Sequence, residues 1–549
     1  MHRSLLTRAG LTISLALCFC VVAGVIFHDR AAGVRHVWNR LAFAWEERFG
    51  EDEDRPPNIR LTAAELRHTR WSQLDDVGTN HRCNQDVTSA PQNETPCAAS
   101  PLNPDVIIVG ANDHRDLDSW GAGFYRTTDG GLTWSDALFT HGAYGNAADP
   151  VICADSTGRF YASYIAYDAN LTNMRVTTQT STDNGVTWST QVVSSGQDMA
   201  DKPFAACDIS AESPYRNNFY VAWVDYGDGS IIHFARSTNH GASFSTPILI
   251  SAGFGQFPCP TVGPNGEVYL VWTDPSAATI QFDHSTDGGV TWSGNRTVAP
   301  FSETHGDGGG CGSFRSPLYP VIACDITSGP HRGALYVCWA DDHRDNDPDI
   351  VFCRSTDGGT TWSAPVTVND DSTNHWQWWP WIAVHPQTGE IGMSWMDRRE
   401  DPQNCRYSCW GTVSTDGGDT WARNFRISDQ LNDPSNVTFL GDYAGTTFSR
   451  QGFFSTWPDL RNDGGDIYGA WWNNDSLRVP PRVTAYRSGN DIRLGWQSTG
   501  APHYRIYSAD SLNGPFTTLE GTTTGTVFMD AGAAAQPVKF YIVRASTEP

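Results

Sequence analysis

Paired aspartate and arginine residues recur in this chain at the ends of predicted strands, and they could bind an anionic group. The phrase Asp-x-Arg occurs four times, at Asp113/Arg115, Asp342/Arg344, Asp397/Arg399 and Asp459/Arg461. A guanidinium binds a carboxylate through two parallel hydrogen bonds. We therefore expect Arg115, Arg344, Arg399 and Arg461 to bind a substrate carboxylate. The alternative is that these pairs are salt bridges that tie neighbouring structural units together.

Further candidate binding residues lie in two connectors between predicted strands. Aromatic faces suit stacking on sugar rings, and arginine and histidine supply hydrogen-bond donors. The candidates in these connectors are Arg315, His375, Trp376 and Trp378. Packing between strands is the alternative role for the tryptophans.

Carboxyl groups near these connectors could catalyse glycosidic bond cleavage, because pairs of Asp or Glu residues perform acid–base chemistry in most glycosidases. We expect Tyr443 to be the nucleophile and Asp397 or Asp442 to transfer the proton. These assignments rest on loop position, and a structural role remains the alternative for each side chain.

Six copies of one turn phrase indicate the elements that position these residues. Each resembles Ser-Thr-Asp-Gly-Gly-x-Thr-Trp, and the copies occupy residues 126–134, 181–188, 237–244, 285–292, 355–362 and 414–421. Asp-Gly and Asn-Gly are strong hairpin signals, since glycine adopts a positive φ without steric cost. The closing Trp, or Phe244 in the third copy, offers an apolar plate for packing between units. Such regular recurrence marks a repeat array.

Two further patterns complete each repeat. Apolar strands end in Trp-x-Asp at Trp223, Trp272, Trp339, Trp395 and Trp457. Ahead of them lie short strands that open on a proline, at Pro150, Pro203, Pro258, Pro320 and Pro380. Each unit therefore has four antiparallel strands, and a radial array of such units is a β-propeller.

We expect seven blades, with six as the alternative. Their ranges are 94–142, 149–196, 201–252, 257–300, 319–370, 379–429 and 440–475. The seventh unit lacks the turn phrase, and we expect it to borrow a closing strand from the N-terminal region, around Asn58 to Ala63. The repeated turns join the third and fourth strands of each blade. A site at the axis should therefore use the opposite end, where the second-to-third and blade-to-blade connections lie.

The turn phrase resembles the Asp box, or BNR repeat, of the sialidases and their relatives, over about residues 94–475. The resemblance implies the propeller fold and a glycoside hydrolase activity, although the same fold also occurs in proteins with no known catalysis. In sialidases the first catalytic arginine lies in a Phe/Tyr-Arg-Ile-Pro phrase before the first Asp box. The matching segment here reads Asn93-Glu94-Thr95-Pro96-Cys97, so we transfer no catalytic role by resemblance.

The two ends of the chain differ from the repeats. Arg3 and Arg8 precede the uncharged run 9–27, which predicts a signal peptide or signal anchor over residues 1–28. Residues 29–80 are expected to form a helical segment and linker, and residues 81–478 the propeller. The run Tyr504 to Phe516 resembles fibronectin type III-like modules, which implies a small β-sandwich over residues 479–549.

Composition bounds the partners and the compartment. The net charge of −24 and the absence of a basic block exclude nucleic-acid binding. Thirteen cysteines suit an exported protein, and removing Cys18 and Cys20 leaves eleven, so at least one thiol is unpaired within the chain. Cys405/Cys409 and Cys338/Cys353 are candidate disulfides. We expect no cofactor, no zinc and no other metal, with calcium in the acidic loop 459–466 as the alternative.

The sequence therefore predicts an all-β protein: a seven-bladed propeller followed by a small β-sandwich. The expected function is that of an exported, sialidase-like glycoside hydrolase acting on an acidic glycan. The alternative is a non-catalytic propeller that binds a glycan or a protein at the cell envelope. We expect a monomer, secreted or membrane-anchored, that contacts a membrane only through its N-terminal segment.

Overall fold

The computed structural model describes residues 80–115, 120–140, 144–170, 173–193, 199–302, 311, 314–317, 319–342, 347–449, 452–462, 464–473 and six strand segments between 483 and 546. The N-terminal predictions (the signal or anchor segment, the helical segment and the closing strand near Asn58) lie outside the described residues. Among the described residues there is no helix, and hence none that could span a membrane.

Seven sheets form the first compact unit. Blade one consists of β2 (Gln92–Asn93), β3 (Cys97–Ala99), β4 (Ile107–Asp113), β5 (Gly121–Thr127) and β6 (Ser135–Leu138). Blade two consists of β7 (Asn146–Ala154), β8 (Phe160–Tyr167), β9 (Met174–Ser181) and β10 (Ser189–Val192). Blade three consists of β11 (Ala200–Cys207), β12 (Phe219–Asp225), β13 (Ile231–Ser237) and β14 (Ile248–Leu249). In each sheet the strands pair antiparallel in chain order, and β2 and β3 both pair with β4 as two halves of one innermost strand.

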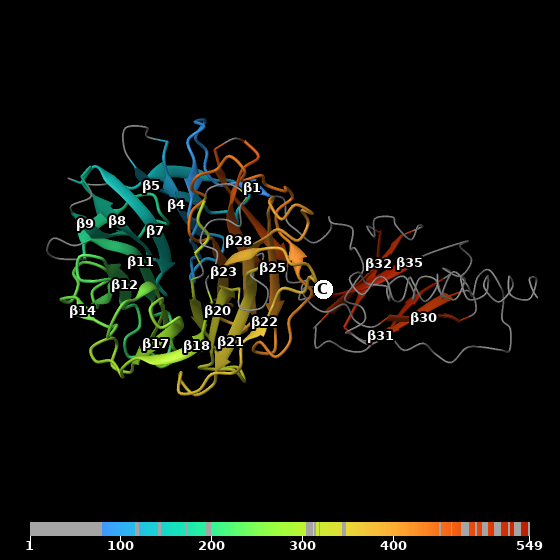
Figure 1. The fold of residues 1–549 in the computed structure, drawn as a ribbon. Helices are drawn as coiled ribbons and strands as arrows, with labels where there is room; N and C mark the ends of the chain where they lie inside the picture. Colours follow the sequence, from blue (N-terminus) through green and yellow to red (C-terminus); the bar gives the residue numbers. More distant parts are fainter. Residues whose placement is uncertain are drawn as a thin grey trace, which may run out of the picture. The chain divides into compact units, whose positions relative to one another are not determined.

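The remaining blades repeat this pattern. Blade four consists of β15 (Gln256–Val262), β16 (Val268–Asp274), β17 (Thr279–Ser285) and β18 (Arg296–Pro300), and blade five of β19 (Val321–Cys324), β20 (Leu335–Asp341), β21 (Asp349–Ser355) and β22 (Val366–Thr367). Blade six consists of β23 (Gln377–Val384), β24 (Ile391–Asp397), β25 (Ser408–Ser414) and β26 (Phe425–Arg426). Blade seven consists of β27 (Gly445–Ser449), β28 (Gly452–Asp459), β29 (Asp466–Asn473) and β1 (His81–Arg82). The innermost strands contact one another around a closed ring, from β3 through β7 to β27 and back. The seven-bladed β-propeller prediction is confirmed, and Figure 1 shows the blades following one another in chain order.

The seventh blade is completed from the other end of the chain. Strand β1 pairs antiparallel with β29, with His81 opposite Gly469 and Arg82 opposite Tyr468. Arg82 binds Asp466 at 2.6 Å, so a charged pair also holds this strand. An N-terminal strand closes the blade, as predicted, and residues 81–82 form it; the range given for it, 58–63, lies outside the described residues. Only residues 83–91 separate β1 from β2 of blade one, so the chain passes from the closing strand of blade seven directly into the first blade.

Tryptophans of the Trp-x-Asp phrases form part of the core. The five are at most 1 % exposed: Trp223, Trp272, Trp339, Trp395 and Trp457. In three blades the indole N–H donates to the aspartate two residues later, at 2.8 Å for Trp339, 2.8 Å for Trp395 and 3.0 Å for Trp457. In these three blades the phrase lets a large apolar ring be buried with its one polar group satisfied, whereas the buried Trp223 N–H has no hydrogen-bond partner.

The repeated turns share one hydrogen-bond pattern, seen in the turn at Asp287. Its carboxylate accepts the backbone N–H groups of Val290 at 3.0 Å and Thr291 at 2.8 Å, and the Thr291 hydroxyl at 2.6 Å. Burial opposes ionisation slightly, but these hydrogen bonds lower the pKa of Asp287 to about 2. Gly289 has φ 84°, and a Cβ there would lie 2.8 Å from the Phe234 ring of the preceding blade. The turn thus needs glycine for its conformation and for blade packing.

The tryptophan that ends each phrase packs against a phenylalanine of the preceding blade. Ring centroids are 4.9 Å apart for Trp292 and Phe234, and 5.0 Å apart for Trp421 and Phe352. The predicted role of this residue as a plate between units is confirmed at these blades.

A second compact unit contains six described strands. They are β30 (Val483–Ser488), β31 (Asp491–Trp496), β32 (His503–Ala509), β33 (Thr518–Thr523), β34 (Val527–Asp530) and β35 (Phe540–Ser546). They form two three-stranded antiparallel sheets, β30-β31-β34 and β33-β32-β35. Ile492 and Leu494 of one sheet and Tyr504, Ile506 and Val543 of the other are buried. Two small sheets agree with the predicted β-sandwich, and the fibronectin type III-like class remains a prediction.

Replacing the turn carboxylate should destabilise the propeller. We expect Asp287→Ala to lower the free energy of unfolding by about 1–2 kcal/mol, because four donor groups lose their acceptor, the fourth being the Ser285 hydroxyl at 2.7 Å. The matched control is Asp287→Asn, since Asn239 stands naturally at this position and accepts the Ser243 N–H at 3.0 Å. Urea unfolding of the three proteins should rank Asp287→Asn between wild type and Asp287→Ala. Equal stability of all three would contradict a structural role.

Candidate functional site

One backbone feature recurs at the start of the innermost strands. Five residues that are not glycine have a positive φ there: Glu94 (57°), Asp149 (56°), Lys202 (48°), Phe257 (56°) and Trp379 (52°). All except Glu94, which lies two residues ahead of Pro96, come directly before a proline. In blades two, three, four and six the strand register shifts at this point, which marks a β-bulge. A bulge redirects a side chain away from the regular alternation of the strand.

The bulge residues of the first three blades meet in a buried ion cluster. The Lys202 ammonium lies 3.0 Å from Glu94 Oε1, 2.9 Å from Asp149 Oδ2 and 2.7 Å from Asp442 Oδ2. Only 2 % of the Lys202 side chain is exposed, and none of the Glu94 or Asp442 side chains. One cation thus joins carboxyl groups from blades one, two and seven.

The carboxyl groups of this cluster differ in protonation. Burial raises the pKa of Glu94 well above its usual value, and the nearby Asp149 carboxylate adds to the rise. Burial also disfavours the charged form of Asp149, but Lys202 and hydrogen bonds from Asp201 and Glu94 outweigh it and lower its pKa. These shifts favour a protonated Glu94 beside an ionised Asp149, and such a separation suits general acid–base chemistry.

The lysine is held in its charged form. Burial alone would lower the pKa of Lys202, but the carboxylates of Asp149, Asp442 and Glu94 raise it well above the ordinary value. Lys202 is therefore an electrostatic anchor and not a nucleophile, since nucleophilic attack requires the neutral amine.

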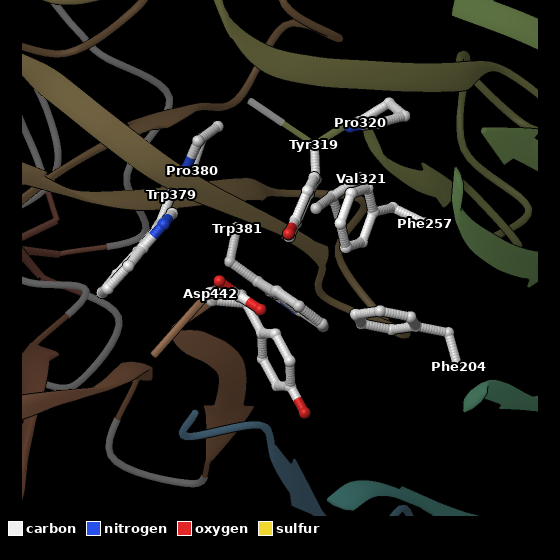
Figure 2. A pocket seen from close by; sticks show the side chains of 10 residues that line it. Phe204, Phe257, Tyr319, Pro320, Val321, Trp379, Pro380, Trp381 and Asp442 are labelled. Carbon is white, nitrogen blue, oxygen red and sulfur yellow. The ribbon is translucent and has the colours of Figure 1, made fainter. Parts of the chain in front are cut away.

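Aromatic residues form the other half of the site. A pocket is lined by Phe204, Phe257, Tyr319, Pro320, Val321, Trp379, Pro380, Trp381, Asp442 and Tyr443. Figure 2 shows the rings around one space, with the Asp442 carboxylate among them. The Tyr443 hydroxyl donates to the Pro150 carbonyl at 3.0 Å. Burial, together with the nearby Glu94 and Asp149 carboxyl groups, raises the pKa of Tyr443. Asp442 is thus the acidic group of the pocket wall.

Arg315 joins the pocket to the preceding connector. Its Nε and Nη2 atoms bind the two oxygens of Asp442 at 2.7 and 2.5 Å. The guanidinium lies 5.3 Å from the centroid of the Phe439 ring, and 56 % of the Arg315 side chain is exposed. Of the sequence-predicted residues, the structure therefore brings Arg315, Asp442 and Tyr443 together.

The arginines of the Asp-x-Arg phrases lie on acidic groups of their own. Arg399 binds Asp397 at 2.7 Å and Asp370 of the preceding blade's connector at 2.9 Å. Arg461 binds Asp459 at 2.7 Å and Asp429 at 2.5 Å. Arg115 binds Asp113 and Asp136, both at 2.6 Å. These contacts match the alternative reading, in which the pairs stabilise blades and their junctions. Arg344 lies outside the described residues.

The other predicted residues lie beside the pocket and not in its wall. Trp376 and Trp378 are 3 % and 0 % exposed, and both rings contact the Arg398 guanidinium, 5.3 and 4.9 Å from their centroids. A His375 ring nitrogen is 3.2 Å from the Arg398 carbonyl oxygen. Asp397 is fully buried, and its carboxylate accepts from Trp395 and Arg399. The adjacent Trp379 is the tryptophan of this loop that lines the pocket.

Glu94, Asp149, Lys202 and Phe257 were not among the site residues predicted from the sequence. The available signal was the proline that opens each innermost strand, because the bulge residues precede it. The resemblance to sialidases also marks the position, since the segment that should carry their first arginine contains Glu94.

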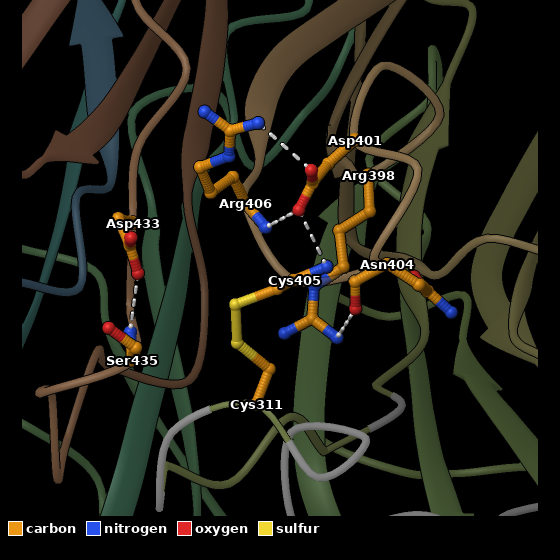
Figure 3. The surroundings of a disulfide bond; sticks show 8 residues. All are labelled: Cys311, Arg398, Asp401, Asn404, Cys405, Arg406, Asp433 and Ser435. Carbon is orange, nitrogen blue, oxygen red and sulfur yellow. Dashed lines mark hydrogen bonds and ion pairs between the residues drawn. A yellow bond between two sulfur atoms is a disulfide. The ribbon is translucent and has the colours of Figure 1, made fainter.

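A disulfide anchors the connector that carries Arg315. Cys311 is bonded to Cys405 of blade six (Figure 3). The Asp401 carboxylate fixes the other side of this loop by accepting the N–H groups of Cys405 at 3.1 Å and Arg406 at 2.8 Å. The expected pairs Cys405/Cys409 and Cys338/Cys353 are wrong, because Cys405 is used here and the other three are free thiols. The prediction relied on cysteines that are close in the sequence, whereas the fold places Cys311, 94 positions away, next to Cys405.

Metal ligation finds no support among the described residues, where no group of three or more His, Cys, Asp or Glu is placed to hold an ion. In the acidic loop considered for calcium, Asp459 binds Arg461 and Asp466 binds Arg82.

Comparisons with known proteins give a low overall similarity. No protein-family model and no curated protein matches the chain. Among solved structures, a Hadza microbial sialidase is 14 % identical over 69 % of this chain and 75 % of its own, with a TM-score of 0.40. An intramolecular trans-sialidase from Ruminococcus gnavus is 15 % identical over 74 % and 99 %, with a TM-score of 0.38. An α-L-arabinanase from Penicillium chrysogenum is 12 % identical over 59 % and 94 %, with a TM-score of 0.40. At these scores the similarity decides nothing about activity.

Removing the central cation should be more harmful than neutralising Glu94. We expect Lys202→Met to lower the free energy of unfolding at pH 7 by about 3–5 kcal/mol, because Asp149 and Asp442 remain buried without their ammonium. Glu94→Gln, which replaces an already neutral carboxyl, should cost less than about 2 kcal/mol. Denaturant unfolding of both variants measures the difference. If Glu94→Gln is as destabilising as Lys202→Met, Glu94 is ionised in the folded protein.

The cluster should also make stability depend on pH. The folded pKa of Glu94 is raised, and that of Asp201 rises to about 7 through burial and the Asp149 carboxylate. The unfolded chain releases both protons near pH 4. Stability contributed by these protons is present below pH 4 and is lost as the pH rises through the folded pKa values. We expect the free energy of unfolding to fall between pH 5 and 8, and to fall less in Glu94→Gln. An identical slope in the two proteins would refute the raised pKa of Glu94.

Proposed function

We propose that the protein is an exported glycoside hydrolase that binds one sugar residue of a glycan in the axial pocket and cleaves the adjoining glycosidic bond. One observation carries the proposal: a pocket walled by aromatic rings contains a carboxylate that belongs to a buried, partly protonated carboxyl cluster. Aromatic walls suit the apolar faces of a sugar, and two carboxyl groups of different protonation state suit glycoside cleavage.

Asp442 is the residue that we assign to direct contact with the sugar. Its carboxylate lines the pocket and is bound by two cations, Lys202 at 2.7 Å and Arg315 at 2.5 Å. Fixed in this way, it can stabilise the positive charge that develops at the anomeric carbon, or attack that carbon. Tyr443 is assigned to the pocket wall, because its hydroxyl is directed to the Pro150 carbonyl.

Glu94 is the residue that we assign to proton supply. Its raised pKa favours the protonated form, and its Oε1 lies 3.0 Å from the Lys202 Nζ that also binds Asp442. In this scheme the Glu94 proton is the one passed to the oxygen of the leaving sugar, while Lys202, whose raised pKa favours the ammonium, keeps its own proton and holds Asp442 ionised. Lys202 is a positioning residue in this scheme.

The finer proposal is that the sugar is acidic. Arg315 is the half-exposed cation beside the pocket, so a substrate carboxylate would bind there in competition with Asp442. The Lys202 charge is already balanced by three carboxyl groups and leaves Arg315 to select the substrate.

A second candidate function is non-catalytic binding of a glycan or protein. One observation favours it: Glu94, Lys202 and Asp442 are at most 2 % exposed and satisfy one another. A cluster of this kind can serve only to fix the bulge residues, with the aromatic rings as the binding surface.

The experiment is an assay of the purified full chain on sialosides, uronic acid glycans and neutral arabinans. We expect product release from one class, a loss of about 100-fold or more in kcat for Asp442→Asn, and a rise in KM for Trp381→Ala. Arg315→Ala should weaken the binding of acidic substrates more than the binding of neutral ones. The matched control is Arg461→Ala, which removes an equally paired guanidinium outside the pocket and should leave KM unchanged.

The outcomes separate the two candidates. If wild type releases product and the Asp442→Asn variant releases it equally well, the assigned site is wrong. No release from any glycan, combined with saturable binding that Trp381→Ala weakens, supports the binding protein and refutes the hydrolase.

A further inference from the structure

Two cysteines on neighbouring innermost strands lie in direct contact. Cys153 belongs to β7 of blade two and Cys207 to β11 of blade three, and their sulfur atoms are 3.0 Å apart. That separation is about 1 Å longer than the sulfur–sulfur bond of a disulfide, which is about 2.05 Å. Both side chains are half-buried, so a small oxidant can reach them.

We propose that Cys153 and Cys207 form a disulfide that joins blades two and three. The two strands already contact each other along the ring, so the bond requires a small rotation of the thiols and no change of register. The inference does not depend on the proposed function, because it concerns the covalent state of the propeller.

The surroundings of the pair affect how fast it can be oxidised. Burial raises the pKa of Cys207, and the Cys153 thiol and the acidic Asp155 and Asp208 add to the rise. The thiolate of Cys207 is therefore poorly stabilised, and the neutral thiol is favoured. Since thiol–disulfide exchange proceeds through the thiolate, we expect the bond to form slowly at neutral pH and faster as the pH rises.

The reaction balances as thiol–disulfide exchange with a glutathione-type disulfide. One cysteine loses its proton, attacks the oxidant's disulfide and releases one molecule of thiol. The second cysteine then attacks the mixed disulfide at the protein sulfur, which forms the Cys153–Cys207 bond and releases a second thiol. Two electrons pass from the protein to the oxidant, and the two cysteine protons are taken up by the released thiolates.

The bond would restrict the relative movement of the two strands that carry Asp149 and Lys202 of the candidate site. Cys153 is four residues after Asp149, and Cys207 is five residues after Lys202. These two bulge residues form an ion pair at 2.9 Å. A covalent link further along the same two strands would limit how far that pair can separate.

Peptide mapping of the full chain tests the bond directly. The protein is incubated with oxidised glutathione at pH 8, unfolded in an alkylating agent and digested without reduction. We expect a cross-linked peptide containing Cys153 and Cys207. Cys311–Cys405 is the positive control for an intact disulfide, and the buried free thiols Cys338 and Cys353 should be alkylated. Recovery of Cys153 and Cys207 as alkylated thiols, with Cys311–Cys405 intact, overturns the proposal.

Thermal unfolding provides a second readout. The link closes a loop of 54 residues, so oxidised wild type should unfold about 5 °C above oxidised Cys207→Ala. Under reducing conditions this difference should shrink, since Cys311–Cys405 is lost equally from both proteins. Cys338→Ala controls for the packing effect of removing a buried thiol and should lower the unfolding temperature equally under both conditions. A Cys207→Ala difference that is independent of reduction contradicts the bond.

Discussion

The site depends on a left-handed backbone conformation at the start of the innermost strands. A residue with a side chain costs about 1–3 kcal/mol in that conformation, yet it recurs at Glu94, Asp149, Lys202, Phe257 and Trp379. The paired strands on either side of each bulge hold it in place. Since every blade starts its innermost strand at the same end of the ring, the redirected side chains converge there. The repeated left-handed position thus brings together functional side chains that lie far apart in the sequence.

The converging residues divide into a charged half and an aromatic half. Blades one to three supply Glu94, Asp149 and Lys202, and the following blades supply Phe257, Tyr319 and Trp379. Charged groups are stable at this depth because each finds an opposite charge from another blade. Asp442 belongs to both halves, since it binds Lys202 and lines the aromatic pocket. The pocket therefore has one apolar side and one side with hydrogen-bonding groups.

Arginine–aspartate pairs have another role in the same propeller. Arg399 and Arg461 reach carboxylates of the preceding blade's connector, at Asp370 and Asp429, so they hold neighbouring blades together. Each also packs over an aromatic ring, Trp410 at 4.3 Å and Tyr468 at 4.0 Å. Such pairs, the repeated turns and the closing strand β1 fix the ring. The ring in turn fixes the separation of the bulges.

The sequence alone predicted the all-β propeller, the order of strands within each blade and seven blades as the expected count, with six as the alternative. It could do so because turn residues and apolar strands act over a few neighbouring positions. The closing strand at His81–Arg82, the Cys311–Cys405 bond and the partners of Lys202 were decided by the tertiary structure. Arg399 and Lys202 are both cations near the end of a strand, and no local pattern shows which one faces the axis. Only the bulge and the closure of the ring set that direction, because they join residues more than a hundred positions apart.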